Sequence, residues 1–74
     1  MATVLQKKRV GDEVIILMQT EVLWYAVERV RMTPTGPERI ITVFNKTFST
    51  ALEKFDKMVE DARIRANNDL NTKL

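Results

Sequence analysis

The side chains best suited to chemistry in this sequence are two groups of cations and a pair of adjacent aromatic residues. The cations are Lys7, Lys8, Arg9, Arg29, Arg31 and Arg39. The aromatic pair, Trp24 and Tyr25, shortly precedes the first of these arginines. Proteins that bind single-stranded nucleic acid place cations along the phosphates and aromatic rings under the bases. The pattern therefore makes nucleic-acid binding one candidate function.

The residue types that most enzymes need are absent. The sequence has no histidine and no cysteine, which removes the commonest general bases, nucleophiles and transition-metal ligands. Gly11 and Gly36 are the only glycines, and each stands alone in its own turn, so no glycine-rich phosphate loop is present. The single serine, Ser49, stands where a helix begins and is explained by capping. We predict a non-enzymatic protein without cofactor or metal.

Length and composition are those of one small globular domain. The 74 residues carry a net charge of +2 and are 45% hydrophobic. A charge this small permits an acidic or nucleic-acid partner without requiring one. Neither a signal-peptide pattern nor an apolar run of membrane-spanning length occurs. We expect a single domain over residues 1–74, located in the cytoplasm and not in a membrane.

A helix is the clearest element of the sequence. Apolar residues recur at spacings of three and four from Phe48 to Ala66, and charges of both signs lie between them. The predicted helix covers about residues 48–68, and residues 69–74 read as a flexible polar tail. Ile64 lies outside the apolar stripe, between two arginines.

The segment before the helix predicts a sheet over about residues 3–44. Residues 13–19 and 38–44 are rich in β-branched and apolar residues, as strands are. Residues 21–32 could form a helix, but their valines, their aromatics and the turn after Thr33 favour a strand. The predicted fold is α+β: an antiparallel meander of three or four strands followed by one long helix on one sheet face.

The hairpin around Pro34 predicts two apolar faces. If Met32 lies opposite Glu38, side-chain alternation sorts the two strands into two sets. One face carries Leu23, Tyr25, Val27, Ile41 and Val43, with Arg29, Arg31 and Arg39 at its turn end. The other carries Trp24, Ala26, Val30, Met32, Ile40 and Phe44, with Glu28, Glu38 and Thr42. Because one helix covers only one face, the other needs a further interface.

This uncovered face predicts a second candidate function, which we favour over nucleic-acid binding. A small non-enzymatic protein of this build acts as a regulatory module, an inhibitor, adaptor or assembly factor that docks on a larger protein. The candidate partner-binding residues are Trp24, Tyr25, Met32 and Ile64. A homodimer or small homo-oligomer through the same face is also expected.

Overall fold

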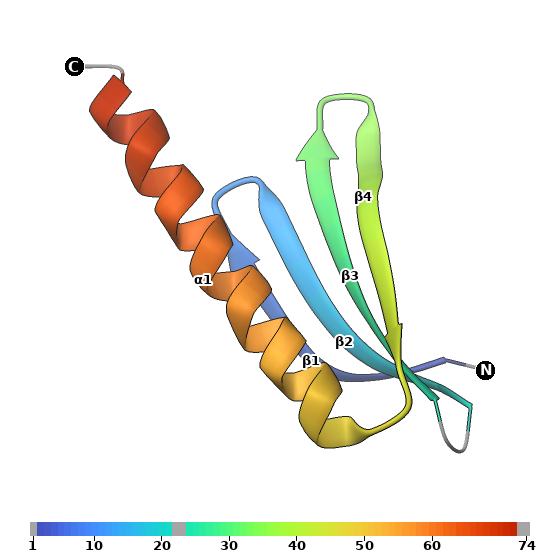
Figure 1. Ribbon diagram of the computed structural model, residues 1–74. Helices are drawn as coiled ribbons and strands as arrows, with labels where there is room; N and C mark the ends of the chain where they lie inside the picture. The colour runs from blue at the N-terminus through green and yellow to red at the C-terminus, as the bar shows by residue number, and fades with distance from the viewer. Residues whose placement is uncertain (1, 22–23, 73–74) are drawn as a thin grey trace.

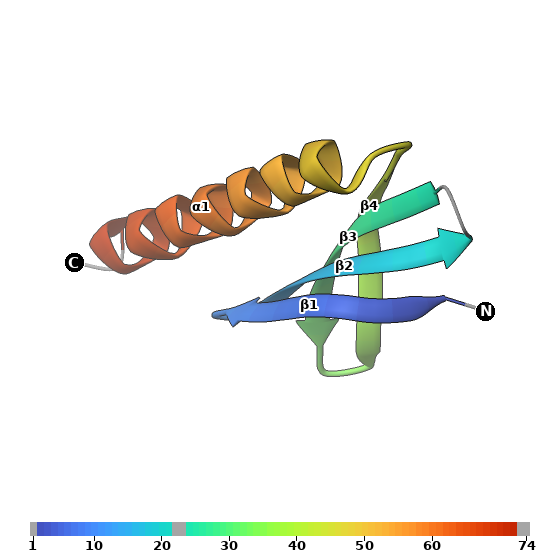
Figure 2. The ribbon, with the colours of Figure 1, turned by 90° about the horizontal axis from the view of Figure 1, so that it is seen from below.

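The computed structural model describes residues 2–21 and 24–72, and it shows the predicted α+β fold. Four strands form one antiparallel sheet in the order β1-β2-β3-β4. They are β1 (Thr3–Val10), β2 (Glu13–Glu21), β3 (Trp24–Thr33) and β4 (Gly36–Asn45), and the helix α1 (Phe48–Thr72) follows. The helix lies across one face of the twisted sheet and leaves the other face open (Figures 1 and 2).

Short connections join neighbouring strands. Gly11, with φ 61°, turns the chain from β1 into β2. Thr33 lies opposite Gly36, so only Pro34 and Thr35 connect β3 to β4. Gly36 has φ 127°, a conformation that side-chain-bearing residues rarely adopt. Thr33 Oγ1 donates a hydrogen bond of 2.5 Å to the Gly36 carbonyl and closes the turn.

The core lies between α1 and the middle of the sheet. Ile15 and Leu17 of β2 and Val27 of β3 are fully buried against Ala51, Phe55 and Val59 of the helix. Burying a side chain of this size stabilises the fold by roughly 1.5–3 kcal/mol. The helical spacing of three and four is therefore the spacing that fills the core, as the sequence predicted.

The helix begins where the sequence placed it and ends later. The Thr50 N–H donates to Thr47 Oγ1 at 3.3 Å, so Thr47 caps the first turn. The expected capping role of Ser49 is wrong, because Ser49 lies within the first turn of the helix. The helix continues to Thr72, beyond the expected end at 68, and passes the β1–β2 turn (Figure 1). Residues 73 and 74 of the predicted tail and Leu23 of the predicted sheet face lie outside the described residues.

The predicted register is right for one half of the β3–β4 hairpin and wrong for the other. Arg29 lies opposite Ile41 and Val27 opposite Val43, as expected. Beyond Arg29 the register shifts by one residue, so Val30 lies opposite Arg39. The tight turn forces this shift, and an extra residue on β4, a β-bulge, restores the original register. Arg39 therefore leaves the face of Arg29 and joins the opposite face.

Candidate protein-docking face

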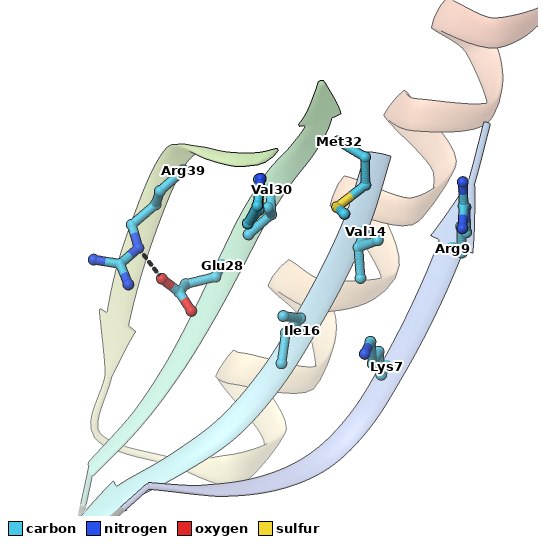
Figure 3. Close-up of a pocket in the computed structure, with 9 residues that line it drawn as sticks. Lys7, Arg9, Val14, Ile16, Glu28, Val30, Met32 and Arg39 are labelled. Atoms are coloured by element: carbon cyan, nitrogen blue, oxygen red, sulfur yellow. Dashed lines mark ion pairs between the residues drawn. The ribbon is translucent and has the colours of Figure 1, made fainter. Parts of the chain in front are cut away.

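The side of the sheet that α1 does not cover, which we call the open face, carries an apolar hollow edged by charges. The hollow has a volume of about 530 Å³. It is lined by Lys7, Arg9, Val14, Ile16, Glu28, Val30, Met32, Pro37 and Arg39. Figure 3 shows these side chains on the four strands, with α1 behind the sheet. All four strands therefore contribute to one continuous surface.

Every second side chain of the central strands β2 and β3 points to the open face. Those at the floor of the hollow are apolar. Val14 and Ile16 of β2 lie beside Val30 and Met32 of β3. Val14 is already buried by its neighbours, whereas the Met32 side chain stays 40% exposed. The floor thus offers an adaptable thioether among rigid β-branched residues, a composition that suits protein contacts.

Basic side chains lie on both sides of the hollow. Lys7 and Arg9 project from β1, and Arg39 projects from β4 (Figure 3). Arg39 forms an ion pair with Glu28, whose carboxylate also accepts a hydrogen bond of 3.4 Å from Thr42 Oγ1. Glu28 is buried, and its partners satisfy it. Lys7 and Arg9 have no such carboxylate in the hollow, so the face is positive along β1.

Two exposed aromatic residues extend the open face away from the hollow. Phe44 lies opposite Ala26 and is 60% exposed. Trp24 is 39% exposed, and the Lys46 ammonium lies 5.6 Å from its ring centroid, in cation–π range. Alternation along β3 puts Trp24 on the side of Ala26 and Glu28.

The other predicted site residues lie elsewhere. Tyr25 is half-buried on the helix side and meets Phe48 edge to face, with ring centroids 5.8 Å apart. Lys8 also lies on the helix side, near Phe55. Ile64 is 49% exposed on α1.

The expected cluster of Arg29, Arg31 and Arg39 does not form. The register shift separates Arg39 from the other two. Arg31 is exposed beside Asp12 and Glu13. Trp24 and Met32 of the predicted partner-binding residues therefore lie on the open face. Lys7, Arg9 and Arg39 of the predicted nucleic-acid-binding residues lie on the same face.

The helix side carries a charged cluster that the sequence did not reveal. Glu13 is buried and receives hydrogen bonds from Arg65 at 2.9 and 3.0 Å, and it forms an ion pair with Arg29. Burial favours a higher pKa for Glu13, but the two arginines outweigh it and hold the pKa below its usual value. Glu13 in turn raises the pKa of Arg65. The cluster joins β2, β3 and α1.

A signal for this cluster exists in the sequence. Glu13 is in phase with Ile15 and Leu17, so its carboxylate must enter the covered face. A buried carboxylate requires a cationic partner. Arg65 lies three residues after Ala62 of the apolar helix stripe and supplies that partner.

Comparison with known proteins adds no assignment: the chain matches no protein-family model, no curated protein and no solved structure. Within the described residues, no group of acidic side chains could hold a metal ion. No helix in the described part of the chain is long and apolar enough to cross a membrane.

Proposed function

We propose that this is a non-enzymatic regulatory protein that docks on a larger protein partner through its open face. The observation that carries the proposal is the apolar hollow on an uncovered sheet, edged by Lys7, Arg9 and Arg39. An apolar centre within a polar rim is the usual anatomy of a protein interface. The cationic rim favours a partner whose docking surface is apolar with acidic residues around it.

The surface area of the chain supports the same proposal. The accessible surface is 5396 Å², whereas a compact monomer of 8.6 kDa exposes about 4700 Å². The radius of gyration is 13.2 Å, against about 11.3 Å for a compact domain of this length. The chain thus exposes about 700 Å² more than a compact monomer, as expected of a sheet with one uncovered face.

A second copy of the chain fits the open face less well than an acidic partner. Stacking two open faces brings two cationic rims together, and Glu28 is already paired with Arg39. Juxtaposed like charges oppose such an interface. The homodimer and the cytoplasmic location predicted from the sequence remain predictions.

Affinity capture with matched variants tests the docking proposal. Met32→Glu puts a charge into the hollow, and Ile64→Glu makes the same kind of change at a similarly exposed position on α1 (40% and 49% exposed). We expect wild type and Ile64→Glu to retain a stoichiometric protein from nuclease-treated native lysate, and Met32→Glu to lose it. Retention by Met32→Glu, or loss by both variants, would contradict docking through the hollow.

Single-stranded nucleic acid is a second candidate for the same face. The exposed rings of Phe44 and Trp24 and the cations of β1 favour it. Binding to a single-stranded oligonucleotide would fall steeply with added salt and would weaken in Lys7→Ala/Arg9→Ala. No binding at low ionic strength would exclude this candidate.

A further inference from the structure

A second surface lies on the helix side of the sheet, where α1 diverges from β4 (Figure 1). We call it the edge groove. It has a volume of about 260 Å³ and is lined by Arg29, Ile41, Val43, Lys54, Lys57, Met58, Asp61 and Arg65. Its floor is formed by the apolar side chains of β4 together with Met58. Ile41 remains 45% exposed there, so the helix leaves this part of the covered face open.

The edge groove has an excess of positive charge. Arg29 and Arg65 are held by Glu13. Lys54 and Lys57 make no ion pair or hydrogen bond with another described residue. Asp61 is the single carboxylate in the lining. Two lysines beside an apolar floor can therefore form ion pairs with an acidic ligand.

The groove opens at the outer edge of β4, which is an unpaired edge of the sheet. Because β4 is last in the strand order, its backbone groups on the outer side have no strand partner among the described residues. Natural proteins guard such edges with lysine, proline or a bulge. β1, the other edge strand, has Lys7, Lys8 and a register shift after Val4. In β4 the features that hinder edge pairing all lie near the turn; they are Pro37, Glu38, Arg39 and the bulge.

Residues 41–45 of β4 carry neither charge nor proline and lie beside the groove. We propose that this stretch accepts an extended acidic segment of another protein as a fifth strand. Pairing would satisfy the free backbone groups of β4. Side-chain alternation would direct every second residue of the segment into the groove, where carboxylates reach Lys54 and Lys57. The residues between them would lie on the open side, beside Phe44.

A second copy of β4 does not supply this chemistry. Residues 41–45 contain no carboxylate, and pairing β4 with its own copy brings the lysines of two grooves together. The acidic strand is thus the occupant that both the edge and the charge favour. This proposal is independent of docking on the open face, since the lining residues of the two surfaces differ.

The test uses the full chain labelled with ¹⁵N and a short capped peptide in which glutamate and valine alternate. We expect amide shifts confined to residues 41–45 and to α1 around Lys54 and Lys57. Lys54→Gln/Lys57→Gln should weaken binding about tenfold or more, and Met32→Glu should bind as wild type does. A peptide with lysine in place of glutamate should not bind. Shifts elsewhere, or equal binding by the double variant, would overturn the proposal.

Backbone methylation separates strand pairing from simple charge attraction. Two further peptides carry N-methyl groups on all glutamates or on all valines, and only one set of N–H groups can face β4. One peptide should lose binding while the other keeps it; equal binding by both would refute a fifth strand. Concentration-dependent shifts in residues 41–45 without peptide would instead show self-pairing and overturn the acidic-strand proposal. If the peptide does not bind while the affinity capture with Met32→Glu gives the expected result, the edge-groove proposal is rejected and docking on the open face is retained.

Discussion

Replacing Glu13 with glutamine should destabilise the fold by breaking the ion cluster between the sheet and the helix. The Glu13 carboxylate is buried and holds two guanidinium groups, one from β3 and one from α1. Glutamine keeps the size of the side chain and removes its charge. Arg29 and Arg65 then lose their counter-ion and lie close together in a partly dry site. The contact between the far end of α1 and the sheet is weakened at the same time.

The magnitude follows from how exposed the two arginines are. Removing one partner of a fully buried ion pair costs about 3–5 kcal/mol. Here the side chain of Arg29 is 20% exposed and that of Arg65 is 37% exposed, so water recovers part of the loss. We expect a loss of about 2 kcal/mol, which corresponds to about 8–16 °C in Tm for a domain of this size.

Thermal unfolding followed by circular dichroism measures this loss. Glu38→Gln is the matched control, because Glu38 is exposed on β4 and the same chemical change there should alter stability by less than about 0.5 kcal/mol. A Tm for Glu13→Gln within about 4 °C of wild type would show that the cluster contributes little. The assignment of Glu13 as the link between sheet and helix would then be wrong.

The pH dependence gives a second readout of the same perturbation. The pKa of Glu13 in the folded chain lies below its usual value of 4.5, because Arg65 and Arg29 outweigh the effect of burial. A lowered pKa stabilises the fold above the unfolded value, and this stabilisation is lost as pH falls through the folded value. The stability difference between wild type and Glu13→Gln should therefore be full near neutral pH and shrink below about pH 4.5. A difference that stays constant down to strongly acidic pH would refute the charge-based explanation.

Three further predictions concern the helix start, the core and the open face, and denaturant unfolding measures each. Thr47→Ala removes the acceptor that caps the Thr50 N–H and should lower the free energy of unfolding by about 1 kcal/mol. An unchanged denaturation midpoint would show that Thr47 does not stabilise the helix start. Leu17→Ala empties a fully buried position and should cost about 3 kcal/mol, whereas a loss below about 1 kcal/mol would mean that the core collapses around the gap. Phe44→Ser changes a side chain that is 60% exposed and should leave stability within about 0.5 kcal/mol; a larger loss would place Phe44 in the folded core.

The fold was largely predictable because the strongest patterns are local. The stripe from Phe48 to Ala66 and the β-branched runs required no knowledge of distant contacts. The sequence of residues 21–32 was compatible with either a strand or a helix. Trp24–Thr33 forms β3 because β2 and β4 pair with it on both sides. The helix end was missed because residues 67–72 are polar except for Leu70, and a single apolar residue leaves no helical spacing to recognise.

The candidate site was predictable only in part. Two apolar sheet faces and one covering helix were expected, and they are present. The place of Arg39 depended on the bulge in β4 between Arg39 and Ile41. The register predicted from a wider turn did not contain this bulge. The ion cluster around Glu13 spans positions far apart in the chain, so its partners became evident only when β2, β3 and α1 were assembled.

Methionine oxidation in the captured complex distinguishes docking on the open face from docking in the edge groove. Met32 lies in the hollow of the open face, and Met58 lies in the edge groove on the other side of the sheet. Exposed methionines oxidise faster than buried ones, so dilute peroxide followed by mass spectrometry reports which face the partner covers. Docking on the open face predicts that Met32 is protected in the complex and that its oxidation in the free chain is rapid. An unchanged rate at Met32 in the complex would contradict the proposed function, and protection at Met58 alone would place the partner in the edge groove.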